Sequence, residues 1–290
     1  MTVAVVGPGS LVAGALRRAR ASAGWRFVRW QDAVAADDWL DGVSCVVNCA
    51  YDPRLRAGAP YDPALDVDLR IARRVSARPG TLQLMLSTRA AYGPAGADPV
   101  LREDRPPAPD RPYGASKLAT ERALGAPLGE RLTALRLSNV FGDEAVPGRR
   151  TLVGVALATL RERGAIVLDI APGVARDFVP VEAVADAIAR VVAAPRPGVF
   201  NVGSGVGTPV GAIARALIEG YGAGRIDVTD RRHHDAFVLD LAAAGAAFGI
   251  APLAPATIRE RCVAIGRALR DRDPDGADRG RPSGPSTRRV

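Results

Sequence analysis

Short apolar runs alternate with helical patterns along the first half of this chain. Strand-like runs occur at Val3–Val6, Arg26–Trp30, Ser44–Ala50, Leu82–Ser87 and Leu132–Leu137, and helical spacing at 11–19, 65–77 and 113–124. Strands that alternate with helices favour a parallel sheet with right-handed crossovers, so the predicted fold class is α/β. Because the carboxyl ends of parallel strands meet at one edge, we look for the functional site there.

The charge balance and the cysteines exclude several classes of protein. The net charge is +8, but the basic residues are scattered, without a stripe or interleaved aromatics, so we expect no nucleic-acid partner. No apolar run approaches about 18 residues, so we expect no membrane span. Met1 leads directly into a strand-like run without a signal peptide, and the three cysteines lack metal-site spacing. A cytoplasmic protein with buried thiols and no metal is expected.

The first strand runs into a glycine-containing turn and a helix. Gly7, Gly9 and Ser10 occupy the turn, where free backbone N–H groups at a helix start can bind a phosphate. An ordinary strand-to-helix turn is the alternative. After the second strand, Asp32 is the nearest acid and Arg29 the nearest base, so a preference for NAD or for NADP stays open.

Tyr113 and Lys117 lie four residues apart in a predicted helix, and Lys117 is the only lysine of the chain. Residues at this spacing share a helix face. A nearby ammonium stabilises a phenolate, so that a phenol can exchange a proton while hydride moves at the same carbon. Thr88, at the end of an upstream strand, could share that proton, and we prefer it to Ser87. A surface pair without function is the alternative.

Several ordered motifs surround this pair. They are Ser87-Thr88, Tyr92-Gly93, Tyr113-Gly114-Ala115-Ser116-Lys117 with Glu121, Arg136 to Gly142, Arg176 to Val181, and Asn201 to Gly205. In this order they resemble the extended short-chain dehydrogenases/reductases, also called the NAD-dependent epimerase/dehydratase family. The family's three-glycine turn is represented here by Gly7, Ser10 and Ala13. The resemblance implies a Rossmann-like doubly wound parallel sheet and a smaller C-terminal substrate lobe.

The resemblance also implies roles for individual residues. Thr88, Tyr113 and Lys117 would be catalytic. Cofactor contacts would come from Gly7, Gly9, Ser10, Asp32, Asn48, Ala50, Tyr113 and Lys117. Substrate contacts would come from Thr88, Asn139, Arg176 and Arg232. The sequence departs from the family at Asp68, where an asparagine is frequent, and at His233-His234, which we interpret as loop residues.

The implied reaction is hydride transfer with NAD or NADP on a nucleotide-activated sugar. Sugar dehydratases of the family usually carry an Asp-Glu pair after the strand-end threonine, and this chain has Arg89-Ala90 there. The resemblance therefore favours 4-epimerisation or reduction of a 4-keto sugar, and leaves these two open. It also implies a homodimer. The short link between the second and third strands, together with the altered glycine turn, leaves a non-catalytic dinucleotide-binding or scaffold protein as an alternative.

The predicted organisation has three parts. A dinucleotide-binding domain covers residues 1–142, and later segments at about 176–202 return to it. A substrate-binding lobe covers most of 143–270. The tail at 271–290 has almost no apolar side chains and is predicted to be disordered.

Overall fold

The computed structural model describes residues 2–143 and 151–273, which form two compact units. Among these residues, the first unit contains 2–140, 177–206 and 237–252, and the second contains the rest. The chain passes from the first unit to the second in β7 (Asn139–Phe141) and returns in β9 (Ala175–Pro180). The predicted disordered tail lies outside the described residues beyond Asp273, and Asp271 and Arg272 belong to a helix.

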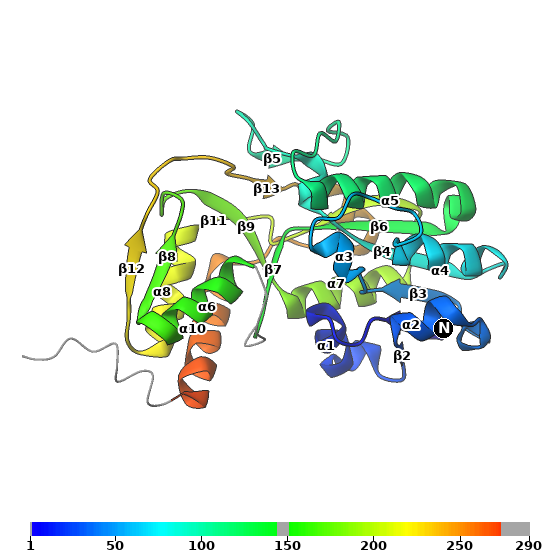
Figure 1. Ribbon diagram of the computed structural model, residues 1–290, viewed down its shortest axis with the longest axis horizontal. Helices are drawn as coiled ribbons and strands as arrows, with labels where there is room; N and C mark the ends of the chain where they lie inside the picture. Colours follow the sequence, from blue (N-terminus) through cyan, green and yellow to red (C-terminus); the bar gives the residue numbers. More distant parts are fainter. Residues whose placement is uncertain (1, 144–150, 274–290) are drawn as a thin grey trace, which may run out of the picture. The chain divides into compact units, whose positions relative to one another are not determined.

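A parallel six-stranded sheet forms the centre of the first unit (Figure 1). Its order is β10-β6-β4-β3-β1-β2, and every neighbouring pair is parallel, which confirms the predicted α/β class. The strands are β1 (Val3–Val6), β2 (Arg26–Val28), β3 (Cys45–Asn48), β4 (Leu82–Thr88), β6 (Leu132–Leu137) and β10 (Gly198–Val202).

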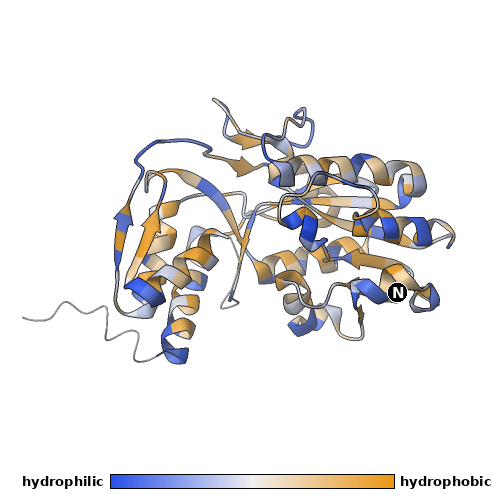
Figure 2. Cartoon of the chain, viewed as in Figure 1, coloured by the Kyte–Doolittle hydropathy of each residue, from blue (hydrophilic) through white to orange (hydrophobic). Residues whose placement is uncertain are grey.

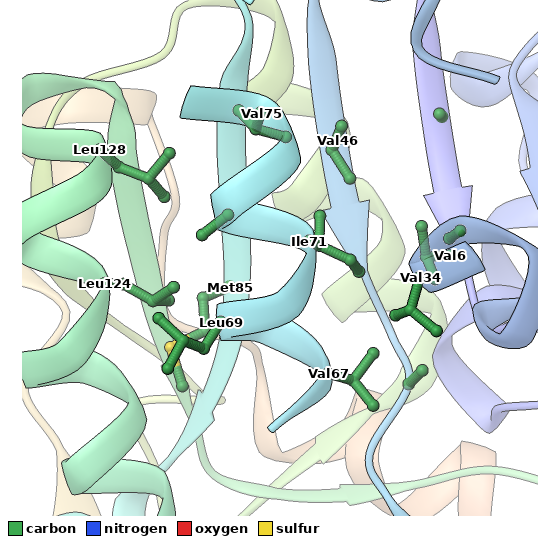
Figure 3. Close-up of a cluster of buried hydrophobic side chains, with 14 of the residues drawn as sticks. Val6, Val34, Val46, Val67, Leu69, Ile71, Val75, Met85, Leu124 and Leu128 are labelled. Atoms are coloured by element: carbon green, nitrogen blue, oxygen red, sulfur yellow. The ribbon is translucent and has the colours of Figure 1, made fainter. Parts of the chain in front are cut away.

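Helices cover both faces of this sheet. Successive side chains of a strand point to opposite faces, and all four residues of β1 are buried. On one face, α2 (Trp30–Ala35), α4 (Val67–Ser76) and α5 (Pro112–Leu128) contribute to a single apolar cluster with the strands. In that cluster Ile71 of α4 lies beside Val46 of β3, and Leu69 lies beside Met85 of β4 (Figure 3). The helices α1 (Leu11–Arg18) and α7 (Val181–Ala193) pack against each other.

The hydropathy of the elements agrees with this layering. Figure 2 shows largely hydrophobic central strands and helices that carry both hydrophobic and hydrophilic residues. A buried Leu, Ile or Val side chain contributes about 1.5–3 kcal/mol relative to an exposed one, so the apolar cluster beneath α4 and α5 is a major source of stability.

The edge of the sheet at β2 differs from the sequence prediction. The strand ends at Val28 instead of Trp30, because Trp30 begins α2 and packs on the apolar cluster. The chain then passes through a 3₁₀ turn at Asp38–Leu40 to β3, on the other side of β1. Residues 29–44 contain no further strand, so β2 is the outermost strand on this side.

Smaller elements complete the first unit. They are α3 (Pro53–Arg56), the 3₁₀ turn η3 (Arg89–Tyr92), β5 (Val100–Leu101) paired with β13 (Val238–Leu239), and α9 (Ala242–Phe248). The buried carboxylate of Asp177 joins β13 to the turn after β10. It accepts hydrogen bonds from the backbone and hydroxyl of Ser204, both at 2.8 Å, and from the backbone N–H groups of Gly205 and Leu239, both at 3.1 Å.

The second unit is built around two closely packed helices. In α8 (Val210–Tyr221), a Cβ on Gly220 would lie 2.0 Å from the Val263 oxygen of α10 (Pro255–Arg272), so the helices approach too closely for a side chain. The other elements are α6 (Leu152–Arg163), β8 (Ala165–Leu168), β11 (Gly207–Pro209) and β12 (Arg225–Val228). Among the described residues, no helix combines the length and the apolar character that crossing a membrane requires.

Candidate active site

Two glycines bring the segment after β4 close to α5 and to the loop that precedes it. Gly93 has φ +74°, and a Cβ there would lie 1.9 Å from the Ala108 oxygen. A Cβ on Gly114 would lie 2.3 Å from the oxygen of Ala90, in η3. Only glycine fits at either position without moving the backbone. Gly114 thus allows η3, which follows Thr88, to touch the first turn of α5, and Gly93 allows the end of η3 to approach the loop at Ala108.

Tyr113 and Lys117 occupy this first part of α5 in very different surroundings. The Tyr113 side chain is the more open, with the residue 43% exposed, whereas Lys117 is 4% exposed. Since the two residues are one helical turn apart, the Lys117 ammonium is buried while the neighbouring Tyr113 phenol is exposed and can reach a ligand. A polar reactant could therefore meet the phenol without displacing the lysine.

The ammonium of Lys117 is held by two groups from outside α5. Its Nζ lies 3.4 Å from Oδ2 of Asp68 in α4 and 4.8 Å from the ring centroid of Tyr51, which follows β3. The Tyr51 ring also meets the Tyr113 ring edge-on, with centroids 5.5 Å apart and an interplanar angle of 89°. The Tyr51 hydroxyl donates to Oγ of Ser116 at 3.0 Å. Asp68 and Tyr51 thus fix the ammonium of Lys117, and Tyr51 is itself held by Tyr113 and Ser116.

Burial controls the charges of this cluster. It raises the pKa of the Asp68 carboxyl to about 6, against the opposing effect of Lys117. Burial alone would lower the pKa of Lys117, but nearby negative charge, Asp68 first, outweighs it and the pKa rises above 10.5. Burial also raises the pKa of Tyr51. At pH 7 the cluster therefore contains an ammonium, a carboxylate and a neutral Tyr51 phenol.

The hydroxyls of Ser87 and Thr88 lie in different surroundings. Ser87 is buried and donates to Glu121, which forms an ion pair of 2.7 Å with Arg136 of β6. Thr88 is only half-buried, and its Oγ1 accepts from the N–H of Ala90 at 3.2 Å. This arrangement leaves the Thr88 O–H able to donate, which supports the choice of Thr88 over Ser87 for contact with a substrate.

The glycine turn after β1 has room for a ligand at its tip. Gly7 has φ +84°, and a Cβ there would lie 2.8 Å from Cβ of Ala50, so the turn and the end of β3 are in close contact. No atom lies within 4 Å of a Cβ built on Gly9. Ser10 caps α1 by accepting from the N–H of Ala13 at 3.0 Å, leaving the first two N–H groups of the helix for an anion. The turn therefore fits a diphosphate.

The end of β3 is shaped by Asn48. Its amide accepts from the N–H of Ala50 at 3.0 Å and donates to the oxygen of the same residue at 3.2 Å. This bonding ends β3 two residues earlier than the predicted Ser44–Ala50 run. The neighbouring Cys49 has its pKa raised to about 12 by burial, so it is a neutral thiol. Asn48 acts on the backbone here, and Ala50 forms the wall beside Gly7.

Asp32 and Arg29, the candidates for the adenosine end of a dinucleotide, bind each other. The Arg29 guanidinium donates to both carboxylate oxygens of Asp32, at 2.8 and 3.0 Å. Both side chains are exposed; Arg29 directly follows the edge strand β2, and Asp32 lies in the first turn of α2. A ribose hydroxyl would meet the carboxylate, and a 2′-phosphate would meet the guanidinium, so the pair alone does not favour one cofactor.

The predicted substrate contacts are divided between the two units. Asn139 begins β7 at the end of the first unit, while Arg176 and Arg232 belong to the second. Arg176 donates to the backbone oxygen of Asp235 at 3.0 Å, which links its motif to the segment that carries Arg232. Arg232 is exposed and pairs with Asp230. Within residues 2–143 and 151–273, no cluster of His, Cys, Asp or Glu suited to a metal is present.

Sequence reasoning missed Tyr51 and gave Asp68 no role. Tyr51 lies just after a strand end, and nothing in its own sequence neighbourhood indicates contact with Lys117. The acid at 68 was recognised as unusual, and its burial could be expected from the apolar spacing of α4. Both contacts arise from the packing of β3 and α4 against α5, which spacing along one helix does not reveal.

Comparison with known proteins agrees with the fold and the motifs. The family model described as "NAD dependent epimerase/dehydratase family" matches residues 4–203, about two thirds of the chain. A curated relative, UDP-glucose 4-epimerase of Azospirillum brasilense, is 36% identical over 154 residues, which are 46% of this chain and 44% of the relative. The match thus spans less than half the length of that relative.

Solved structures share the fold over nearly the whole chain. One is RMD from Pseudomonas aeruginosa complexed with NADPH, with a TM-score of 0.73 and 22% identity, covering 94% of this chain and 100% of that one. Another is UDP-glucose 4-epimerase of Thermotoga maritima with UDP-glucose, with a TM-score of 0.77 and 20% identity, covering 94% and 99%. With the family model matching residues 4–203, this chain belongs to the NAD dependent epimerase/dehydratase family.

Proposed function

We propose that this chain is an NAD(P)-dependent oxidoreductase or epimerase that acts on a nucleotide-activated sugar through Thr88, Tyr113 and Lys117. The observation on which this proposal rests is the buried Lys117 ammonium, which lies one helical turn from the exposed Tyr113 phenol and beside the end of β4. The family membership and the similarity to UDP-glucose 4-epimerases support a sugar nucleotide as substrate.

In this proposal the three side chains handle one proton. The Thr88 hydroxyl binds the substrate oxygen, and the Tyr113 phenolate accepts the proton of the substrate hydroxyl as the carbon is oxidised to a ketone. In the reducing direction the phenol returns that proton. Lys117 stabilises the negative phenolate by its charge and stays protonated throughout.

The residues present fit a dinucleotide. The turn at Gly7, Gly9 and Ser10 would hold its diphosphate, with Ala50 beside it, and Asp32 or Arg29 would meet the adenosine ribose. Lys117 would bind the nicotinamide ribose. When bound, the nicotinamide ring supplies the hydride transfer that no side chain can perform.

The side chain after Thr88 favours epimerisation or keto reduction over dehydration. Arg89 stands there, and its guanidinium carbon lies 4.2 Å from the ring centroid of Phe237. A guanidinium does not act as the acid that elimination of water requires, because it keeps its proton at all accessible pH values. We therefore propose 4-epimerisation or 4-keto reduction of the sugar.

Release of bound nucleotide tests the cofactor and the type of reaction together. The purified protein would be denatured, and the nucleotide in the supernatant identified by chromatography. Retained NAD(H) favours an epimerase that recycles its cofactor, and exchangeable NADPH favours a reductase. Calorimetric titration with UDP-, dTDP- and GDP-sugars then tests the substrate class, and binding to none of them would refute a sugar nucleotide.

Variants of the phenol and the ammonium test the site. Tyr113→Phe and Lys117→Met should each lower turnover by about 10²–10⁴-fold, the usual contribution of a positioned acid-base group. Tyr113→Phe should keep its fold and its dinucleotide affinity, because Tyr113 is largely open and makes no buried hydrogen bond that the structure records. Full activity in a folded Tyr113→Phe protein would refute the proposed site.

A non-catalytic dinucleotide-binding or scaffold protein is the second candidate. It is favoured by the edge position of β2 and by Ser10, whose hydroxyl occupies one N–H of the helix start. A folded protein that binds neither NAD(H) nor NADP(H) would fit only a scaffold, and one that binds a dinucleotide but turns over no sugar nucleotide would fit a non-catalytic dinucleotide-binding protein. A homodimer is proposed from the family resemblance, and light scattering of the eluting protein would test it.

A further inference from the structure

The only lysine of this chain is buried against an acid. Lys117 Nζ and Asp68 Oδ2 are 3.4 Å apart, and the two side chains are 5% and 2% exposed. The other carboxylate oxygen of Asp68, Oδ1, has no hydrogen-bond partner in the described part of the chain. The negative charge of Asp68 is therefore compensated mainly by Lys117, with a smaller contribution from the Asn48 side chain, and the ammonium has lost nearly all its water.

An ammonium without water tends to lose its proton. Desolvation favours the neutral amine, and fully buried lysines without a counter-charge titrate several pH units below 10.4. An opposite charge within about 4–6 Å reverses this tendency. Whether Lys117 is charged is thus decided by the groups that face it.

Few of those groups carry a negative charge. Cys49 and Tyr51 after β3 are neutral at pH 7, since burial raises the pKa of each. Tyr113 presents a phenol from α5. Asp66, the N-cap of α4, accepts hydrogen bonds from Leu69, Thr120 and Tyr61, and its negative charge also raises the pKa of Lys117, though less than that of Asp68 does. Asp68 is the acid in direct contact with the ammonium.

We propose that Asp68 is a positioning residue that keeps Lys117 protonated in its buried setting and fixes the ammonium one helical turn from Tyr113. The part that concerns catalysis rests on the proposed function. The charge state itself does not, because it follows from the contact between α4 and α5 alone. A merely structural polar contact at position 68 would be served equally well by an asparagine, which is similar in shape and uncharged.

The single lysine makes this proposal directly measurable. Protein grown with lysine carrying ¹³C at the ε position gives one side-chain signal, whose chemical shift follows the titration of Lys117 without assignment. In the wild-type chain the midpoint should lie above 10.5. In Asp68→Asn it should fall by about two pH units or more. The matched control Asp62→Asn, an exposed acid before the same helix, should leave the midpoint unchanged.

A midpoint in Asp68→Asn within about half a pH unit of wild type would overturn the proposal. If Asp68→Asn does not fold, the double variant Asp68→Asn/Lys117→Met decides. Recovery of folding would identify the uncompensated ammonium as the cause, and continued failure would show that Asp68 has a separate structural role and contradict the proposal.

The titration needs neither cofactor nor substrate, so it separates this proposal from the proposed function. A shifted lysine midpoint in a protein without turnover on any sugar nucleotide would retain the role of Asp68 and refute the function. If turnover is found, its pH profile in Asp68→Asn should lose activity on the alkaline side at the lowered midpoint of Lys117, whereas Asp62→Asn should follow wild type.

Discussion

Ser87 and Thr88 are adjacent hydroxyls whose surroundings predict opposite effects of removal. Thr88→Val should lower turnover by about 10–100-fold, the value of a lost hydrogen bond to a reacting oxygen, with little change in stability. Ser87→Ala should cost about 1–3 kcal/mol, because it removes a donor from Glu121 in a buried network with Arg136, while the folded protein keeps its activity. Turnover and urea unfolding of both variants would check this, and the reverse assignment would contradict it.

Asp68 gives the stability of the chain a specific dependence on pH. Its pKa rises from 3.8 to about 6 on folding, so the folded chain holds this proton more tightly than the unfolded chain. The protonated Asp68 carboxyl therefore contributes its full stabilisation of the folded chain below about pH 4, and this stabilisation is lost as the pH rises to about 6. The unfolding free energy of wild type relative to Asp68→Asn should therefore fall between pH 4 and pH 7.

Denaturant titrations at several pH values measure this difference, with Asp62→Asn as the control. A wild-type chain that gains stability over the same window, relative to Asp68→Asn, would mean that the attraction of Lys117 outweighs the burial of Asp68. In that case the pKa of Asp68 would lie below its ordinary value.

At the residue scale, the sequence predicts what is local. The shared face of Tyr113 and Lys117 follows from helical spacing, and the choice of Thr88 over Ser87 agrees with their surroundings. The partners of Lys117 could not be predicted in the same way. Asp68 and Tyr51 reach it from other elements, and the distance between elements depends on packing that no single segment encodes.

At the scale of elements, one helix supplies both a test and its control. In α5, Gly114→Ala would place a Cβ 2.3 Å from the Ala90 oxygen, whereas Gly125→Ala meets no atom within 4 Å. We expect Gly114→Ala to cost about 1–3 kcal/mol by overpacking and to reduce activity further by moving η3 away from Tyr113. Gly125→Ala should stabilise the chain by up to about 1 kcal/mol through helix propensity.

Thermal unfolding and turnover of both variants would check this pair. Equal thermal stability and equal turnover of the two variants would mean that neither the stability nor the activity of the chain depends on the close contact between η3 and α5. The comparison is sharp because the substitution, the helix and the residue types are the same, so only the surroundings differ.

The elements that sequence reasoning recognised are those with long apolar patterns. The strand at 132–137 begins and ends as predicted, and the helix predicted at 113–124 lies within α5. The two-residue strands β5 and β13 lie in polar, proline-containing segments. Each is a strand only because it pairs with the other, and their sequences show no strand pattern of their own. The second strand ends at Val28, two residues before the predicted Trp30, because Trp30 begins α2 and packs on the apolar cluster.

At the scale of the whole molecule, the first unit depends on distant parts of the chain. Strand β6 pairs with β10, and α1 packs on α7, although β10 and α7 follow residue 180. A fragment of residues 1–142 should therefore lack a cooperative unfolding transition. Circular dichroism during heating would measure this, with the full chain as control, and a sharp transition of the fragment would contradict the prediction.

The return of the chain to the first unit has a consequence for its synthesis. Asp177 cannot bind Leu239 until that residue has left the ribosome, and β6 exposes an unpaired edge until β10 emerges. During this interval the nascent chain presents apolar strands without their final neighbours, which is the condition in which chains aggregate or recruit chaperones. Slowing translation between positions 142 and 198 should therefore lower the yield of native protein.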